Sequence, residues 1–374
     1  MADFDIAVVG LGAMGSASTD ALAVRGARVV AFDRDNPPHT LGSTHGHTRI
    51  IREAYYEHPL YVPLVRRAYE RWDELQRFAG ETLLVQTGGV MAGPERGPLF
   101  AGALASAQTH SIDHEILSPG ELRSRYPAFS PNSDWMALVE KRAGYLKPER
   151  AVSAMIRRAG QNGATLRTNE VVRAWKRTGS AIRVESDKGS VTVERLVIAA
   201  GPWLPSLLGE LKLDIPLEIE RQLSHWFTPR EDHGHFANCP IALWEMPGGD
   251  VFATFPNDGH GIKCGMHHAG APTAPETVNR QVSASENEAA RALLEQVMPG
   301  AGGNVAESRV CLYTNTPDHH FIIDWAEEGR ILVVSPCSGH GFKFASAIGE
   351  IVAQLAMGEN SWLDLSPFSL KRFQ

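Results

Sequence analysis

The sequence predicts an α/β protein in which a parallel β-sheet with helices is joined to a second, mainly antiparallel β domain. Three observations support this prediction. Two apolar runs separated by a glycine-rich turn and a helical stretch fill the first 33 residues. A strand, turn and helix pattern returns at 331–357. Between about 212 and 310, short alternating runs are separated by Gly, Pro and His, which is typical of antiparallel strands.

The first elements form a strand, a turn, a helix and a second strand. Residues 5–9 (DIAVV) are a short apolar run suited to a buried parallel strand. The turn GLGAMG follows, then a helical stretch to about Arg25, and then a second apolar run at 27–32. This order predicts a βαβ unit at the start of the chain.

The glycine-rich turn has the spacing of a dinucleotide-binding loop. Gly10 permits a tight turn, Gly12 lets the backbone approach a pyrophosphate, and Gly15 lets the helix pack closely on the strand. The free N–H groups at the start of the helix attract phosphate. Asp33 ends the second strand, 18 residues after Gly15, where an acid binds ribose hydroxyls. We therefore expect a Rossmann-like dinucleotide site.

The later elements continue the alternation of helix and strand. Apolar residues recur at helical spacing in three segments, and two apolar runs read as buried strands. The last of these strands leads through the glycine-rich turn SPCSGHGFK into the final helix. The predicted helices are 61–78, 148–160 and 344–357, and the predicted extended segments are 164–175, 196–201 and 331–334.

The order of these patterns predicts that the chain leaves the nucleotide-binding domain twice and returns to it. We expect that domain to be discontinuous and to comprise residues 1–85, 145–212 and 311–374. The second domain is then formed by 86–144 and 213–310, and it contributes the substrate side of the site.

Composition excludes several functional classes. The net charge of −7 argues against a nucleic-acid partner, which needs a basic surface. No apolar stretch approaches the roughly 18 residues of a membrane span, and the acidic start MADFD lacks a basic signal-peptide region. The four cysteines show no CxxC spacing, and the HxH and HH pairs lack a recognisable third ligand. We expect a cytoplasmic protein without a metal, a membrane or a nucleic acid.

The position of the dinucleotide motif favours FAD over NAD. NAD-dependent dehydrogenases usually complete the nucleotide fold separately from the catalytic domain. Here LVIAAGPW and SGHGFKFASAIGEI are a late strand and a late helix that return to the same fold. A helix N-terminus beside a flavin would stabilise the anionic reduced ring.

Three segments resemble one family. PPHTLGSTHGHTRIIREAYYEHPLYVPL, CLYTNTPDHHFIID and SGHGFKF, in this order, are similar to the monomeric sarcosine oxidase and N-methyltryptophan oxidase family, whose members are FAD-dependent amine oxidases with a D-amino-acid-oxidase-like fold. The fold implied is an FAD-binding domain of the glutathione-reductase type with an antiparallel substrate domain. The reaction implied is oxidation of a secondary N-methyl amino acid such as sarcosine, with O2 reduced to H2O2 and the imine hydrolysed to formaldehyde.

The resemblance also implies a role for individual residues and a monomeric state. The catalytic residues implied are Lys263, which activates oxygen, and Arg49, His45, His267 and Tyr313. Arg52 and Lys343 hold the substrate carboxylate, and Cys311 anchors FAD through a thioether. The cofactor-binding residues implied are Gly10, Gly12, Gly15, Asp33, Ser43, Thr44, Val172, Gly201, Cys311, Gly339, Gly341, Phe342 and Lys343.

Physical reasoning leaves simpler interpretations of the same residues open. Most arginines are solvated, so Arg52 is also a candidate for an exposed helix residue, and Lys263 for the wet face of a strand. Lys343 at a helix start opposes the helix dipole, which favours an anionic partner. Cys311 is otherwise an ordinary buried thiol, and Cys337 is the next candidate for the anchor.

Two departures from the family pattern concern the substrate and the site. The chain has His47 where the family has an acid, two residues before Arg49. A family tyrosine before the Phe-Pro pair is replaced around Ala253 and Thr254. The alternative substrates are N-methyl-L-tryptophan, pipecolate, proline and a sugar-modified amino acid. An NAD-linked protein and a quinone-linked dehydrogenase are further alternatives, which the colour of the protein and its reoxidation in air distinguish.

Overall fold

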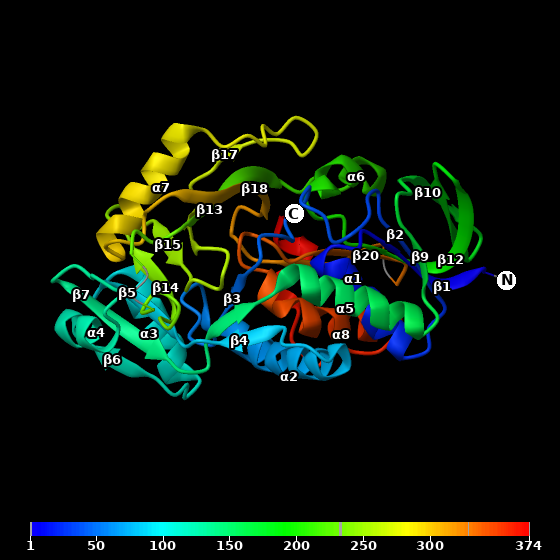
Figure 1. Cartoon of the computed structure of the whole chain (residues 1–374). Helices are drawn as coiled ribbons and strands as arrows, with labels where there is room; N and C mark the ends of the chain where they lie inside the picture. The colour runs from blue at the N-terminus through cyan, green and yellow to red at the C-terminus, as the bar shows by residue number, and fades with distance from the viewer. Residues whose placement is uncertain (1, 232–233, 328, 374) are drawn as a thin grey trace.

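The computed structural model describes residues 2–231, 234–327 and 329–373, and these form two lobes that lie side by side (Figure 1). One lobe is built on a sheet with a parallel centre and the other on a mainly antiparallel sheet. No helix in these three ranges combines the length and hydropathy needed to span a bilayer. The predicted α/β class is confirmed.

The first sheet has eight strands within the described residues. Its parallel centre has the order β9, β2, β1, β12 and β20, with Val8 of β1 opposite Ala31 on one side and Val197 on the other. Buried Val, Ile and Leu side chains fill this centre, as expected for strands covered on both faces. The strands are β1 (Phe4–Val9), β2 (Val29–Phe32), β9 (Thr165–Arg167), β10 (Val172–Thr178), β11 (Ala181–Ser186), β12 (Gly189–Ile198), β19 (Ile322–Glu327) and β20 (Ile331–Ser335).

Helices α1, α5 and α8 pack together beside this sheet, with α2 against α5 and α8 (Figure 1). α1 is rich in Ala, Ser and Gly and is buried almost all round, because its small side chains let neighbouring elements approach closely. The helices are α1 (Ala13–Val24), α2 (Val62–Ala79), α3 (Pro98–Thr109), α4 (Pro119–Arg125), α5 (Pro148–Gln161), α6 (Leu204–Leu211), α7 (Ala284–Val297) and α8 (Ala345–Ala356). Short 3-10 turns are η1 (Pro59–Tyr61), η2 (Gly201–Trp203), η3 (Phe342–Phe344), η4 (Ser366–Phe368) and η5 (Leu370–Phe373).

The second sheet has nine strands within the described residues, and all its pairs are antiparallel except β14 with β5. Its longest pair, β13 with β18, runs from this lobe toward the junction of the lobes (Figure 1). The strands are β5 (Gly89–Pro94), β6 (Glu115–Leu117), β7 (Trp135–Glu140), β13 (Glu218–Phe227), β14 (Ile241–Glu245), β15 (Val251–Thr254), β16 (Ile262–His267), β17 (Ala271–Pro272) and β18 (Val305–Asn315).

A small third sheet lies at the junction. It contains β3 (Arg49–Ile51), β4 (Leu84–Gln86) and β8 (Gly144–Leu146), with β8 in the middle. Strand β3 therefore fixes the position of Arg49 between the two lobes.

Two details differ from the predicted elements. The single extended segment expected at 164–175 is two strands, β9 and β10, because Asn169 between them has a left-handed φ of 54° that ends the strand. The region expected to be antiparallel also contains α7, which Ser283 and Glu286 cap reciprocally. The predicted domain division is untested and stays a prediction, although β18 passes through its boundary between 310 and 311.

Candidate active site

A cavity of about 630 Å³ lies where the two lobes meet. The segments around it come from both lobes: the turn between β1 and α1, the loop after β2, and strands β3, β15, β16 and β18. The segment between β20 and α8 closes it on another side. A site of this kind, at the carboxyl ends of parallel strands, is where open α/β folds bind ligands.

The glycine-rich turn fits a dinucleotide. Gly10 has a left-handed φ of 94°, and a Cβ atom there would lie 2.4 Å from the carbonyl oxygen of Ala199. A Cβ at Gly15 would lie 1.7 Å from the carbonyl oxygen of Gly10, so the close packing of helix on strand requires glycine. Gly12 is the N-cap of α1 and lines the cavity without a side chain to cover the helix terminus. The N-terminus of α1 is thus open to a phosphate group.

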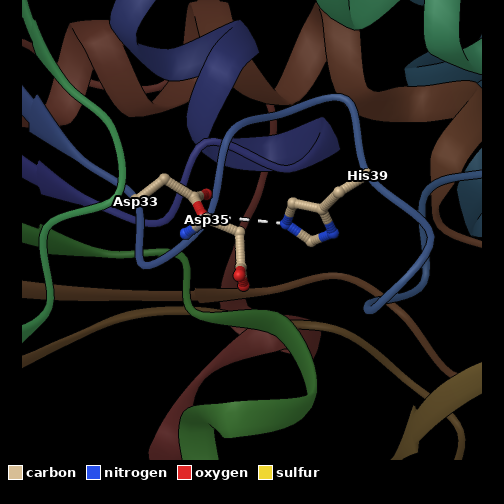
Figure 2. Close-up of side chains that lie close together, drawn as sticks. All are labelled: Asp33, Asp35 and His39. Carbon is tan, nitrogen blue, oxygen red and sulfur yellow. Dashed lines mark hydrogen bonds and ion pairs between the residues drawn. The ribbon is translucent and has the colours of Figure 1, made fainter.

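Asp33 lies at the end of β2 with Asp35 and His39, as Figure 2 shows. Its carboxylate accepts hydrogen bonds from the backbone N–H groups of Leu11 (2.7 Å) and Asp35 (2.9 Å), and His39 Nε2 lies 3.7 Å from it. One donor atom of each of the three side chains falls within 4.8 Å of the others. Asp33 thus braces the glycine-rich turn and lines the cavity, so this cluster lies at the end of the cavity formed by that turn.

Arg49 and Lys263 form one pair of cations. Lys263 Nζ donates to the carbonyl oxygens of Gly46 (2.9 Å) and Thr48 (2.7 Å). Arg49 donates to the carbonyl oxygens of Thr48 (2.9 Å) and Ser43 (3.1 Å). Burial, and next the Arg49 guanidinium, lower the pKa of Lys263 well below its usual value. This pair is held by carbonyl dipoles.

Arg52 and Lys343 form a second pair, and Tyr55 connects them. Arg52 donates to Glu57 (2.6 Å) and to the carbonyl oxygen of Ala54 (2.7 Å), and its guanidinium lies 4.4 Å from the centre of the Tyr55 ring. Lys343 Nζ donates to Tyr55 Oη, at 3.3 Å. Burial, and next the charge of Arg52, lower the pKa of Lys343 to about 7. Both cations line the cavity although they are far apart in the sequence.

His267 and Tyr313 lie together on another wall of the cavity. His267 Nδ1 is 3.3 Å from Tyr313 Oη. Burial lowers the pKa of His267 well below its usual value and raises the pKa of Tyr313. Gly339 packs against both rings, since a Cβ there would lie 2.4 Å from Tyr313 and 2.5 Å from His267. Both side chains are therefore neutral near pH 7.

Cys311 lines the cavity on β18 and is 5% exposed. Its Sγ lies 3.4 Å from the carbonyl oxygen of Ser43 and 3.6 Å from Arg49 Nη2. Cys337 also lines the cavity, but its Sγ accepts a hydrogen bond from the Thr314 N–H, and burial raises the pKa of its thiol. Of the two cavity thiols, Cys311 therefore lies beside a guanidinium and Cys337 beside the backbone.

The structure brings most of the predicted residues together around the cavity. Two are not among the lining residues. Gly15 lies behind the turn, where its role is packing, and His45 is 1% exposed with both ring nitrogens lacking a hydrogen-bond partner among the described residues. Burial, and next Arg49, lower the pKa of His45 to about 3. The lining residues are Gly10, Gly12, Asp33, Ser43, Thr44, Arg49, Arg52, Val172, Gly201, Lys263, His267, Cys311, Tyr313, Gly339, Gly341, Phe342 and Lys343.

The sequence analysis missed the partners of the cations. Arg52 packs on the rings of Tyr55 and Tyr56 and forms an ion pair with Glu57. The sequence YYE, which begins three residues after Arg52, was the signal that could have predicted these contacts. Glu149 accepts a hydrogen bond from the Gly46 N–H at 2.6 Å, and its place at the start of a helix gave no hint of this.

A dinucleotide cradle that shares its cavity with buried cations is typical of oxidoreductases that bind a flavin or nicotinamide. Residues 5–355 match the family model DAO, described as FAD dependent oxidoreductase, and the chain belongs to this family. A monomeric sarcosine oxidase of Streptomyces avermitilis is 39% identical over 361 residues, 95% of this chain and 94% of the relative. An N-methyl-L-tryptophan oxidase of Salmonella heidelberg is 34% identical over 373 residues, 99% of each.

Solved structures share the fold. NikD, an amino acid oxidase of nikkomycin biosynthesis, superposes with a TM-score of 0.87 at 21% identity, covering 98% of this chain and 96% of that chain. Glycine oxidase from Geobacillus kaustophilus gives 0.81 at 19% identity, covering 100% and 99%. These comparisons confirm the predicted family and fold, with FAD as the cofactor and a flavin-dependent amine oxidase as the class of enzyme.

Proposed function

We propose that the protein oxidises a secondary N-methyl amino acid such as sarcosine and passes the electrons to oxygen. One secondary amine, one O2 and one water give one primary amine, one formaldehyde and one H2O2. FAD supplies the two-electron acceptor for this reaction. The observation that carries the proposal is the meeting of a dinucleotide cradle, three buried basic side chains and the half-buried Arg49 in one cavity.

Arg52 and Lys343 are the proposed site for the substrate carboxylate. A guanidinium offers two parallel donors to a carboxylate, and a partly dehydrated lysine adds a point charge. In the structure Glu57 holds the Arg52 guanidinium, at 2.6 Å, so a carboxylate is already its preferred partner. A substrate carboxylate would share or displace this contact.

The cations also bear on the substrate amine, which must lose its proton before or during oxidation. Arg49, Lys263 and protonated Lys343 repel an ammonium and so favour the neutral amine. His267 and Tyr313, both neutral near pH 7, face the cavity as uncharged hydrogen-bonding groups. A pH profile of flavin reduction that is the same in Arg49→Ala protein and wild type would contradict this role.

Lys263 is the proposed site of oxygen activation. Reduction of O2 by one electron produces superoxide, and a fixed cation stabilises the negative charge as it develops. Lys263 is 5% exposed, and the carbonyl oxygens of Gly46 and Thr48 hold its Nζ in place and favour its protonated form against the effect of burial. Arg49 adds a second cation nearby, since both side chains donate to the carbonyl oxygen of Thr48.

Cys311 is the proposed covalent anchor of FAD. Its position beside Arg49 in the cavity supports this, and Cys337 is the alternative thiol. Cys311→Ser protein should lose its yellow colour to the supernatant on acid precipitation, whereas Cys337→Ser protein should keep it. Flavin that stays attached to Cys311→Ser protein after denaturation would contradict the assignment.

A bulkier substrate is the second candidate, because Ala253 lines the cavity where the family carries a tyrosine. It lies on β15 beside the aliphatic lining residues Leu243, Val251 and Ile50. This apolar wall leaves room for a side chain, as in N-methyl-L-tryptophan, pipecolate or proline. A sugar-modified amino acid has less support from an apolar wall.

A peroxide-coupled screen tests the proposal. The holoenzyme is mixed in air with sarcosine, N-methyl-L-tryptophan, pipecolate, proline and a fructosyl amino acid, and H2O2 and formaldehyde are measured. Turnover of an N-methyl amino acid with both products is expected. Absence of turnover with every secondary amine would refute the proposal.

We further propose that the protein works as a monomer in the cytoplasm, without a nucleic-acid or membrane partner. The word "Monomeric" in the relatives' names supports the first point. Size-exclusion chromatography with light scattering should give the mass of one chain, and a dimer mass would contradict this.

A further inference from the structure

His47 lies on a turn that holds Lys263. The turn comprises residues 46–48, and the carbonyl oxygens of Gly46 and Thr48 accept the two hydrogen bonds of Lys263 Nζ. His47 itself is outside the cavity lining and is 22% exposed. Its backbone has a left-handed φ of 62°, which is unusual for a residue with a Cβ atom.

The side chain of His47 ties this turn to β18. Its Nε2 lies 3.0 Å from Glu307 Oε2 and 3.1 Å from Arg309 Nη2. Arg309 also donates to Glu307, so the three side chains form one cluster. Residues 307, 309 and 311 alternate along the strand, and they therefore lie on the same face of β18 as Cys311.

Glu149 secures the backbone of the same turn. Its Oε1 accepts hydrogen bonds from the N–H groups of Gly46 (2.6 Å) and His47 (3.2 Å), and it lies 3.8 Å from Arg309 Nη1. The N–H side of the turn is thus fixed to the carboxylate, and the carbonyl side is directed at Lys263. A residue other than glycine stays in the left-handed conformation only where surrounding contacts stabilise it. For His47 these contacts include those of its side chain with Glu307 and Arg309.

We propose that His47 is a positioning residue for oxygen reduction, which ties the 46–48 turn to Glu307 and Arg309 so that the turn's carbonyls hold Lys263. The inference rests on the proposed function, because it needs Lys263 to act on oxygen. A lysine ammonium is carried on a flexible four-carbon chain. It therefore keeps one position only if the carbonyl oxygens that accept its hydrogen bonds are fixed. Loss of the tether moves the ammonium and slows the oxygen step without affecting the carboxylate end.

The test uses two variants from opposite ends of the tether and one matched control. His47→Gly removes the imidazole, and glycine adopts the left-handed φ without strain. Backbone strain in the variant therefore cannot explain a change in the reoxidation rate. Glu307→Ala removes the partner on β18 and leaves the turn unaltered. His260→Ala is the control, because His260 stacks on the His47 ring at 4.0 Å between centroids but is half exposed and bound to Asp258.

Two rate constants are measured for each FAD-loaded protein. Enzyme reduced with dithionite is mixed with O2 to give the reoxidation rate, and oxidised enzyme is mixed with the amine without oxygen to give the reduction rate. We expect reoxidation of His47→Gly protein to slow about tenfold, since small displacements of a catalytic group have large effects. The reduction rate should stay at the wild-type value. Glu307→Ala should show a smaller loss of the same kind, and the double variant should be no slower than His47→Gly.

The inference is overturned if His47→Gly protein reoxidises at the wild-type rate, or if its reduction and reoxidation rates fall by the same factor. It is also overturned if His260→Ala slows reoxidation as much as His47→Gly does. If His47→Gly protein does not retain FAD, the Glu307→Ala protein decides between these results. Dithionite replaces the amine in the reoxidation assay. Failure of every amine to reduce the flavin would therefore refute the proposed function while the comparison of reoxidation rates still decides the role of His47.

Discussion

The two pairs of basic side chains at the cavity differ in their counter-charges. Arg52 meets the carboxylate of Glu57, and Lys343 lies within reach of the same negative charge. All four side chains donate to backbone carbonyl oxygens, but Arg49 and Lys263 have no carboxylate partner among the described residues, and Arg49 contacts the Cys311 thiol. Arg52 and Lys343 therefore have a carboxylate as counter-charge, whereas Arg49 and Lys263 contact carbonyl dipoles and a thiol.

This difference indicates what each pair can do. Burial of a charge costs several kcal/mol, so neither pair is explained by stability. A pair that already binds a carboxylate can exchange it for the carboxylate of a substrate. A pair held by fixed dipoles keeps its positive potential for a charge that appears only during reaction. Glu149, whose charge acts on Lys263, accepts hydrogen bonds from the backbone N–H groups of Gly46 and His47.

Replacement of Lys263 should separate the two pairs most clearly. Lys263→Met keeps the length of the side chain and removes the charge. The rate constant for reoxidation by O2 should fall about 100-fold or more, as when one preorganised electrostatic group is removed from an active site. Anaerobic flavin reduction, measured in a stopped-flow instrument, should fall by a much smaller factor, because Arg49 and Lys343 still favour the neutral amine. An equal loss in both steps would show that the pairs do not have separate roles.

Replacement of Arg52 should have the opposite pattern. Arg52→Ala removes charge-assisted hydrogen bonds worth about 1.5–3 kcal/mol each, so kcat/KM for the amino acid should fall about 10- to 100-fold. Arg52→Lys keeps the charge without the planar fork, so its kcat/KM should lie between those of the wild type and Arg52→Ala. Reoxidation by O2 should keep the wild-type rate constant in both variants. A reoxidation rate that falls with kcat/KM would contradict the comparison.

The pH dependence of anion binding should sharpen the comparison. Burial and the charge of Arg52 lower the pKa of Lys343 to about 7, so this lysine is charged below that pH and neutral above it. The Kd for acetate, a carboxylate without an amine, should rise above about pH 7 by up to about tenfold per pH unit. Titration of the flavin absorbance measures it. Lys343→Met protein should show no such rise, and a persistent rise would assign the titration to another group.

Restoration of an aromatic residue on β15 should give the smallest effect. Ala253→Tyr narrows the cavity beside the aliphatic wall, so the preference for N-methyl-L-tryptophan over sarcosine should fall about five- to tenfold in kcat/KM. Ala253→Gly is the matched control and should keep or increase the wild-type preference. A thermal melt checks that the variant is folded. An unchanged ratio would place the side-chain pocket elsewhere in the cavity.

The sequence was sufficient where contacts are local. Gly15 packs on Gly10, and Asp33 binds the Leu11 N–H, all within one βαβ unit, so spacing and residue type predicted their arrangement. Arg52 and Lys343 meet only through the tertiary fold, and their pairing was predicted from the family resemblance. The bare pattern could not distinguish them from the other 34 Lys and Arg residues, given 36 in total.

The partners of the cations were beyond prediction for a physical reason. Glu57, Glu149 and Glu307 are ordinary acids in the sequence, and a carboxylate pairs with whichever cation the fold brings near. The direction of a side chain is equally hidden. The family resemblance implied a catalytic role for His45, but its ring is buried and is not among the residues that line the cavity. Its catalytic role stays a prediction.

Strand β18 carries Cys311 near the end of the chain, whereas the dinucleotide turn is made by its first residues. During synthesis on the ribosome, the turn emerges long before the thiol. The proposed covalent bond can then form only after the last strand of the second lobe has paired with β13. Covalent attachment would therefore occur only in chains whose two lobes have both assembled.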